Sequence, residues 1–177
     1  MGIALDAAAN MLYWTDAANG KVQRINLDFT SFVPETLYSK EVAPGKIQTP
    51  WGIALDVPNS MMYWTDGGTE SVQRAPLNGG SASDVEVLLT LEAMGLPAKA
   101  KMRGIALDLG NGRMYWASQS PSKILHAELD GEDVQDMKLP LSGPHPTWLA
   151  LDQYDGKIYW TQRNQDHGIK RANLDAS

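Results

Sequence analysis

MGIALDAAANMLYWTD, residues 1–16, is the stretch that decides the fold, because the chain returns to it three times. The copies read WGIALDVPNSMMYWTD from Trp51, RGIALDLGNGRMYWAS from Arg103 and TWLALDQYDGKIYWTQ from Thr147. The tyrosines that mark the four copies lie 50, 52 and 44 residues apart: Tyr13, Tyr63, Tyr115 and Tyr159. Periods of this length are typical of solenoids, propellers and arrays, and strand content distinguishes these classes.

Each copy predicts four short strands. In the second copy, residues 52–56 form an apolar run, residues 57–60 form a turn, and residues 61–65 form a second run. Further strands are expected at 71–77 and 85–91, and the third copy repeats them at 123–129 and 134–140. Four antiparallel strands per repeat are the arrangement of a β-propeller blade. The sequence therefore predicts one all-β propeller domain with blades at approximately 2–50, 51–102, 103–146 and 147–177, the last without its outer strand.

Composition excludes several functional classes. Hydrophobic residues make up 43% of the 177 and charged residues 20%, as in an ordinary globular protein. A net charge of −6 gives no basic surface for nucleic acid, and no apolar run reaches the 18 residues of a membrane span. There is no cysteine, and His126, His145 and His167 lack metal-ligand spacing, so no metal or other cofactor is expected.

The pattern Gly-Ile-Ala-Leu-Asp, about six further residues, Tyr-Trp-Thr-Asp, then Val-Gln-Arg and a Leu-Asn-Gly turn resembles the YWTD repeat. These are the class B repeats of low-density lipoprotein receptors. The resemblance covers nearly the whole chain and recurs four times in the same order. It implies six-bladed propellers that act as protein-interaction and scaffold domains, and an extracellular or cell-surface location. No basic and apolar signal region precedes the first repeat.

Comparison of the copies predicts structural pairs between adjacent strands. The last residue of the YWTD motif is Asp in two copies, and the next strand carries an Arg in three of the four. The copy with Ser118 is also the copy in which His126 replaces the Arg. A charge-assisted hydrogen bond would explain this joint change. The expected latch pairs are Asp16 with Arg24, Asp66 with Arg74, and Gln162 with Arg171.

The residues just before each inner strand are the binding candidates, because this position lies at the rim of the central face of a propeller. They include types that are frequent in interface hot spots. The full candidate set is Trp51, Arg103, Thr147, Trp148 and His145. Trp148 stands where the other copies have Gly, and either a channel plug or a packing role is open for it. Trp51 could equally cap the core beside Pro50, and Arg103 could belong to a solvated basic stretch.

An enzyme is the less favoured alternative. Some six-bladed propellers are calcium-dependent lactonases or esterases with Asp, Asn and Glu on the central face. In this chain the aspartates that end the inner strands are expected to serve turns instead: Asp6, Asp56, Asp108 and Asp152. No nucleophile elbow, phosphate loop or dinucleotide fingerprint occurs. We therefore expect a non-enzymatic module that binds a protein or peptide on its central face or through its open edges.

Four blades fall short of the six that the resemblance implies, so the chain is expected to be part of a larger ring. Both end blades keep apolar faces without polar caps: Ile3, Leu5, Leu12 and Trp14 in the first, and Leu149, Leu151, Ile158 and Trp160 in the last. Several outcomes are open. Two copies could form a ring of eight blades, another protein could complete the ring, the chain could be a segment of a longer one, or four blades could close alone.

Overall fold

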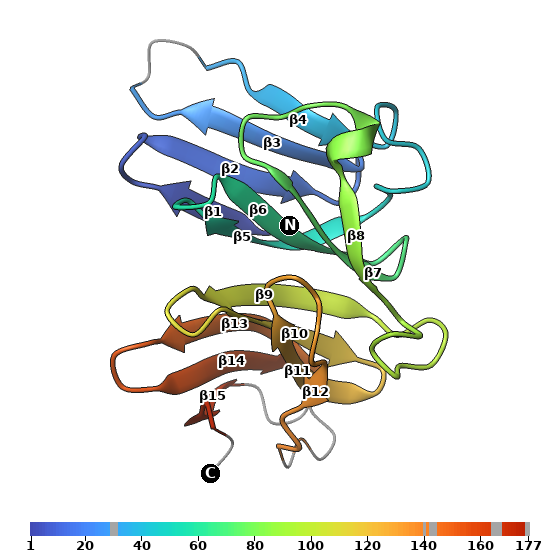
Figure 1. Cartoon of the computed structure of the whole chain (residues 1–177), viewed down its shortest axis with the longest axis vertical. Helices are drawn as coiled ribbons and strands as arrows, with labels where there is room; N and C mark the ends of the chain where they lie inside the picture. Colours follow the sequence, from blue (N-terminus) through green and yellow to red (C-terminus); the bar gives the residue numbers. More distant parts are fainter. Residues whose placement is uncertain (29–31, 140, 142–144, 164–167, 176–177) are drawn as a thin grey trace. The chain divides into compact units, whose positions relative to one another are not determined.

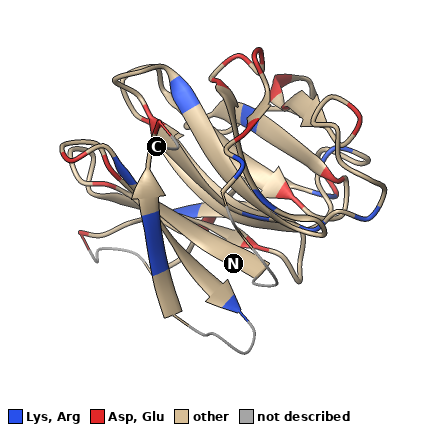
Figure 2. Ribbon diagram, turned by 90° about the horizontal axis from the view of Figure 1, so that it is seen from below, with Lys and Arg blue, Asp and Glu red and all other residues tan. Residues whose placement is uncertain are grey.

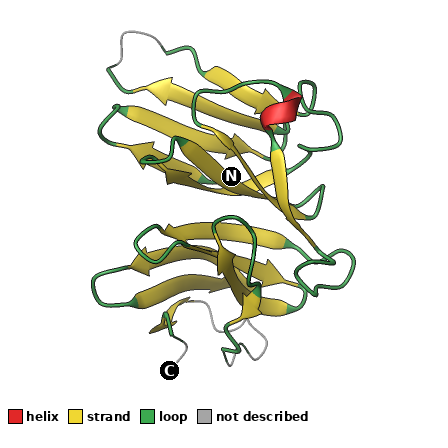
Figure 3. Cartoon of the chain, in the orientation of Figure 1, coloured by secondary structure: helices red, strands yellow, loops and turns green. Residues whose placement is uncertain are grey.

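The structure is a computed structural model that describes residues 1–177 except 29–31, 140, 142–144, 164–167 and 176–177, and it confirms the all-β prediction (Figures 1 and 3). The strands are β1 (Ile3–Asp6), β2 (Met11–Asp16), β3 (Lys21–Asn26), β4 (Glu35–Ser39), β5 (Pro50–Asp56), β6 (Met61–Asp66), β7 (Ser71–Pro76), β8 (Glu86–Thr90), β9 (Met102–Asp108), β10 (Arg113–Gln119), β11 (Ser122–Glu128), β12 (Gln135–Asp136), β13 (His145–Asp152), β14 (Lys157–Arg163) and β15 (Gly168–Asn173). A single turn of 3-10 helix, η1 (Ala82–Asp84), precedes β8. Within the described residues, no helix has the length and apolarity needed to cross a bilayer.

The strands form four sheets in chain order: β1-β2-β3-β4, β5-β6-β7-β8, β9-β10-β11-β12 and β13-β14-β15. Strands that follow each other in the chain pair in antiparallel fashion, as β1–β2, β5–β6, β9–β10 and β13–β14 do, so each sheet is a blade of the predicted kind. The last sheet has three strands, as expected. By contacts the chain divides into two compact units, residues 1–88 and 89–177. The first contains blade one and blade two up to the middle of β8, and the second contains the end of β8 with blades three and four. The single domain stays a prediction.

Within each unit, a motif tyrosine of one blade and a motif tryptophan of the next share the gap between the two blades, because neighbouring residues on a strand point to opposite faces. In the first unit, Tyr13 of blade one and Trp64 of blade two share one core cluster with Ile53 and Met62. The ring of Trp64 also stacks on Tyr38, with centroids 6.2 Å apart. A buried aromatic side chain removes about 150–250 Å² from water, so these residues dominate the stability of the junction.

The second unit repeats this arrangement. Tyr115 of blade three lies in one cluster with Trp160 and Ile158 of blade four. Leu149 and Leu151, on the inner strand of blade four, pack against the same cluster. Each junction therefore pairs the tyrosine face of one blade with the tryptophan face of the blade that follows it within the unit.

Glycine at the start of the inner strand lets these faces meet. A Cβ atom on Gly2 would lie 2.6 Å from the carbonyl oxygen of Trp51, and one on Gly104 would lie 2.8 Å from that of Thr147. Contacts below 3 Å would force the backbone apart, so β1 reaches β5 and β9 reaches β13 only because the side chain is absent. The repeat keeps Gly here for packing.

Of the four apolar residues expected to lie uncovered on the first blade, two are exposed, and Leu12 and Trp14 are half-buried; the choice of residues for the last blade is wrong. On β1, Ile3 and Leu5 are 63% and 55% exposed. The four residues expected on the last blade lie instead on its covered tryptophan face, since Ile158 and Trp160 are buried in the core of the unit. On the opposite face, Ile169 is 73% exposed.

Replacing Gly104 by Ala is expected to lower the free energy of unfolding by about 1–3 kcal/mol, because the new methyl group overlaps the backbone of β13. Urea unfolding of the purified chain measures this. Gly110→Ala is the matched control: its Cβ would meet nothing closer than 3.6 Å, and we expect a change within about 0.5 kcal/mol. Equal losses for both variants would contradict the close-approach argument.

Candidate functional site

Three of the predicted rim residues occupy the same structural position, a β-bulge at the start of an inner strand. The register of β5 on β6 shifts by one residue between Pro50 and Ile53, which places Trp51 in the bulge. Corresponding shifts place Arg103 in a bulge of β9 and Thr147 in a bulge of β13. An extra residue in one strand redirects its side chain, and bulges are frequent next to functional sites.

The threonine of the YWTD motif holds this bend in place. Thr65 Oγ1 accepts a hydrogen bond of 3.0 Å from the backbone N–H of Gly52, and Thr161 Oγ1 accepts one of 3.1 Å from Trp148. In the first blade, Thr15 accepts from Gly2 and also donates to the carbonyl oxygen of Trp51 in the next blade. The third blade has Ala117 at this position and lacks the hydroxyl.

In the second unit, a chain of hydrogen bonds links the candidates of blades three and four. Arg103 donates through Nε to Gln119 Oε1 at 3.0 Å, and Gln119 Nε2 donates to Thr147 Oγ1 at 3.3 Å. Thr147 donates in turn to the carbonyl oxygen of His145, whose ring Nδ1 lies 3.2 Å from Ser122 Oγ. The structure thus brings Arg103, Thr147 and His145 together at one end of the two blades.

Arg163 adds a second positive charge to this site. It is the cross-strand partner of His145 at the end of β14, and its side chain is exposed. Burial lowers the pKa of Arg103, and the nearby Arg163 guanidinium lowers it further. We call these six residues the bulge cluster: Arg103, Gln119, Ser122, His145, Thr147 and Arg163. The cluster presents two guanidinium groups together with amide, hydroxyl and imidazole groups, a set suited to bind polar or anionic groups of another molecule.

Trp51 and Trp148 are placed differently. Trp51 belongs to the first unit, where its indole ring lies over Gly67: a Cβ there would be 3.1 Å from two ring atoms. Gly67 in blade two corresponds to Gln119 in blade three, and Trp51 corresponds to Arg103. The indole ring of Trp51 lies over Gly67, whereas Arg103 donates a hydrogen bond to Gln119. Trp148 is 36% exposed and anchored by its backbone N–H to Thr161.

Sequence comparison missed Gln119, Ser122 and Arg163. The sequence held a signal for two of these three residues: Gln119 and Arg163 both follow the YWTD motif directly, where the first two copies have Ala17 and Gly67. Small residues give way to large polar ones at this position in blades three and four only. Their convergence on the bulge residues depends on the pairing register, which the motif alone does not supply.

The predicted Asp–Arg latch is wrong. Pairing of β2 with β3 sets Tyr13 opposite Arg24 and Asp16 opposite Lys21, so Asp16 and Arg24 are three positions apart. An offset of three positions also puts the two side chains on opposite faces of the sheet, so they do not meet. The other predicted pairs are separated in the same way: Asp66 lies opposite Ser71 and Arg74 opposite Tyr63, whereas Gln162 lies opposite Gly168 and Arg171 opposite Tyr159.

The motif aspartate binds backbone instead. Asp66 is fully buried and accepts hydrogen bonds of 2.9–3.0 Å from the N–H groups of Gln48, Thr49, Gly68 and Thr69. It therefore ties the incoming segment before β5 to the turn after β6. Asp16 makes only the local part of this pattern, with the backbone and side chain of Asn19, and the side-chain contact in particular lowers the pKa of Asp16.

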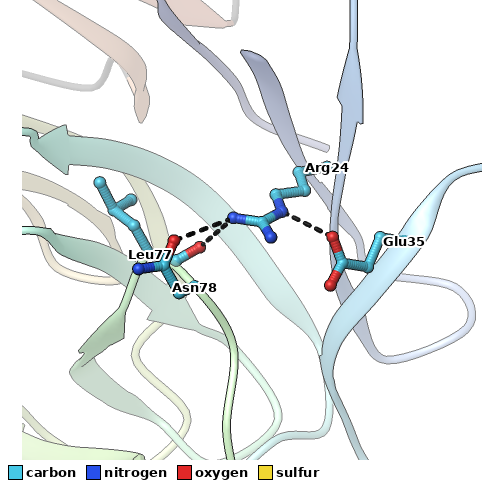
Figure 4. Close-up of polar contacts among 4 residues, drawn as sticks. All are labelled: Arg24, Glu35, Leu77 and Asn78. Carbon is cyan, nitrogen blue, oxygen red and sulfur yellow. Dashed lines mark hydrogen bonds and ion pairs between the residues drawn. The ribbon is translucent and has the colours of Figure 1, made fainter. Parts of the chain in front are cut away.

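The arginine pairs with the outer strand (Figure 4). Arg24 Nε lies 2.7 Å from Glu35 Oε2, and its Nη1 donates to the carbonyl oxygen of Leu77 and to Asn78 in the next blade. Although burial opposes it, the hydrogen bond to Glu35 helps to raise the pKa of Arg24. Arg74 makes the same 2.7 Å contact with Glu86.

In the third blade both partners of this pair are replaced. His126 lies opposite Gln135 and its ring contacts Tyr115, with centroids 5.5 Å apart. Burial lowers the pKa of His126, and Arg113 lowers it further. Blade three therefore lacks both partners of the Arg–Glu pair that joins the third and fourth strands of blades one and two: His126 stands for the arginine and Gln135 for the glutamate.

The aspartates at the ends of the inner strands serve turns, as predicted. Asp56 and Asp108 each accept from the backbone and side chain of the Asn three residues later, and Asp6 and Asp152 accept from turn N–H groups. In the described part of the chain, no group of three or more His, Asp or Glu side chains is placed to hold a metal ion.

Asp66→Ala is expected to lower the free energy of unfolding by roughly 2–4 kcal/mol, because four N–H groups lose a buried acceptor. A double-mutant cycle measured by urea unfolding separates the two pairings. We expect about 0.5–1 kcal/mol of coupling between Arg74 and Glu86, and about zero between Arg74 and Asp66. A strong coupling free energy between Arg74 and Asp66 would show that these two residues pair after all, as the sequence predicted.

No protein-family model matches the chain. Protein cueball of Drosophila simulans is 34% identical over 77 residues, a match that covers 42% of this chain and 12% of that protein. The cueball protein of Drosophila sechellia matches at the same identity and coverage. The matched region thus spans about one eighth of the length of these curated relatives.

Solved structures resemble nearly the whole chain. A chain in the crystal structure of a nidogen/laminin complex has a TM-score of 0.79 at 23% identity, over 97% of this chain and 59% of that one. A structural genomics protein of unknown function from Bacteroides thetaiotaomicron VPI-5482 has a TM-score of 0.68 at 20% identity, over 98% of this chain and 41% of that one. At these identities the likeness concerns the fold. Its four repeats and these likenesses show that the chain has the fold of a YWTD-type β-propeller.

Proposed function

We propose that this chain is a protein-interaction module that binds a protein or peptide partner through the bulge cluster. The observation that carries the proposal is the hydrogen-bonded series from Arg103 through Gln119 and Thr147 to His145. It links side chains from both blades of the unit, and none of its bonds belongs to the repeated framework that holds the other blades together.

The chemistry of the cluster supports a polar or anionic contact on the partner. Arg103 and Gln119 hold each other in one geometry, which reduces the side-chain entropy that binding would otherwise remove. Burial lowers the pKa of Arg103 and the Arg163 guanidinium lowers it further, so a negatively charged group bound near both would offset their repulsion. The structural neighbour from a nidogen/laminin complex adds an example of this fold in a protein–protein assembly.

Binding is tested by selecting peptides from a random display library on the folded chain and measuring their affinity for variants. Arg103→Ala and Gln119→Ala are expected to weaken selected binders roughly tenfold or more, since truncated hot-spot residues cost about 1–4 kcal/mol. Arg113→Ala, which removes an arginine at the opposite end of β10, is the matched control and should leave affinity unchanged. Binders that are insensitive to both cluster variants would contradict the proposed site.

The module is further proposed to be non-enzymatic, with the calcium-dependent propeller hydrolase as the rival. A bound metal stabilises the native state by mass action, so calcium titration followed by thermal unfolding distinguishes the two. We expect a shift of the melting temperature below about 1 °C at millimolar calcium. A shift of several degrees, together with turnover of ester or lactone substrates, would overturn this part of the proposal.

A further inference from the structure

Three Asn-Gly pairs lie in turns of the chain, and one of them has different surroundings from the other two. An asparagine that precedes glycine can lose its side-chain amide, because a glycine without a Cβ atom lets its backbone nitrogen approach the asparagine Cγ atom. The three asparagines are all exposed, so access of solvent does not distinguish them: Asn19, Asn78 and Asn111. Their hydrogen-bond partners do distinguish them.

Asn19 and Asn111 are each held by a carboxylate. Asn19 Nδ2 donates to Asp16 Oδ2 at 2.7 Å, and Asn111 Nδ2 donates to Asp108 Oδ2 at 2.8 Å. The backbone N–H groups of both asparagines donate to the same carboxylates. A nearby negative charge raises the energy of an anion formed on the asparagine amide, so these two side chains are protected from attack.

Asn78 has a positively charged partner instead (Figure 4). Arg24 Nη1 donates to Asn78 Oδ1 at 3.3 Å, while Arg24 Nε donates to Glu35 at 2.7 Å. Attack on the Asn78 Cγ atom places negative charge on Oδ1, which is the atom that the guanidinium contacts. A donor aimed at the oxygen on which charge develops stabilises the transition state of such a reaction. Arg24 therefore favours reaction at Asn78.

The attacking backbone nitrogen, that of Gly79, is weakly held. Its N–H group donates to the carbonyl oxygen of Pro76 at 3.3 Å, beyond the usual length of such a bond. A hydrogen bond of this length costs little to break, so it does not prevent the nitrogen from reaching the side chain of Asn78.

The product of the reaction is the residue that the other copies of the repeat carry at this position. The position follows a leucine whose backbone N–H bonds to the turn between the first two strands of its blade. Much of the acidic colouring in Figure 2 lies in turns and at strand ends. The residues that follow the leucine in the four copies are Asp28, Asn78, Asp130 and Asp175. The fold therefore accommodates a carboxylate at position 78.

We propose that Asn78 is a site of spontaneous deamidation that Arg24 promotes. The Gly79 nitrogen forms a bond to Asn78 Cγ, and the bond from Cγ to Nδ2 breaks. The proton of the Gly79 N–H passes through solvent to the departing amide, which leaves as ammonia, and a succinimide ring remains. Water then opens the ring to Asp or, at the other carbonyl, to isoaspartate. The Asp product places a carboxylate of blade two beside Arg24, which already pairs with Glu35 of blade one.

Peptide mapping by mass spectrometry, during incubation of the purified chain at neutral pH, measures the reaction at all three sites in one sample. We expect Asn78 to convert at least about threefold faster than Asn19 or Asn111, because only Asn78 has a cation at its amide oxygen. Equal rates at the three sites, or faster conversion of either protected asparagine, would overturn the proposal.

Variants of the arginine test its role. Arg24→Gln should slow conversion of Asn78 roughly fivefold, less than the loss of a donor in an enclosed site because solvent screens this contact. Arg24→Lys keeps the charge and should slow it less. Arg74→Gln removes the same kind of ion pair from blade two and is the matched control, with an effect below about twofold.

The rates at Asn19 and Asn111 show whether each variant keeps its fold, since loss of the fold would raise conversion at all three sites together. Unchanged or faster conversion of Asn78 alone in Arg24→Gln would contradict the role of Arg24. Equal slowing in Arg74→Gln would contradict it as well.

Asn78→Asp reproduces the main-chain form of the product. We expect it to raise the melting temperature by about 1–3 °C at low salt, and the gain to shrink at high salt, because salt screens an exposed ion pair. Asn19→Asp is the matched control: it places a second carboxylate beside Asp16 and should lower the melting temperature. No gain in Asn78→Asp at low salt would contradict the proposed contact of the product with Arg24.

Discussion

The close approach of neighbouring inner strands is the constraint on which the packing within each unit depends. Gly2 and Gly104 lie so near the bulged backbone of the next blade that a single methyl group would collide with it. At this spacing the tyrosine face of one blade and the tryptophan face of the next interlock. Wider spacing would leave gaps around the large rings, and dispersion contacts fall off steeply with distance.

The bulge that meets the glycine also produces the candidate site. The extra residue bends the inner strand, and in the second and fourth blades the motif threonine accepts a hydrogen bond from the N–H at the bend. In blade three Ala117 removes this hydroxyl, and Arg103 and Gln119 form a side-chain bond across the same bend. The departures of this blade from the repeat thus coincide with the polar network, which is why we assign function to the second unit.

The misassigned latch shows what repeat comparison can resolve. The copies placed two changes together in blade three, the loss of the arginine and the replacement of the motif Asp by Ser118, and suggested wrongly that these two residues pair. They offered Ser118 as the second change because it lies within the recognisable motif. The actual second change, Gln135, lies on an outer strand whose spacing from the motif varies between copies, so it has no fixed place in a motif-based alignment. Register, which only strand pairing reveals, decided between them.

The sequence by itself determined the all-β class, the number of blades, the strands within them and the three-stranded last blade. These follow from local patterns, because turn residues and alternating side chains are encoded over a few neighbouring positions. The tertiary structure alone decided which blade faces pack together within each unit and which residues pair with Arg24 and Arg74. It also decided that Arg103, Gln119, Thr147 and His145 form one hydrogen-bonded series, with Arg163 opposite His145. Those relations join residues as far apart as 60 positions in the chain, from Arg103 to Arg163, and depend on inter-strand register, which no local pattern specifies.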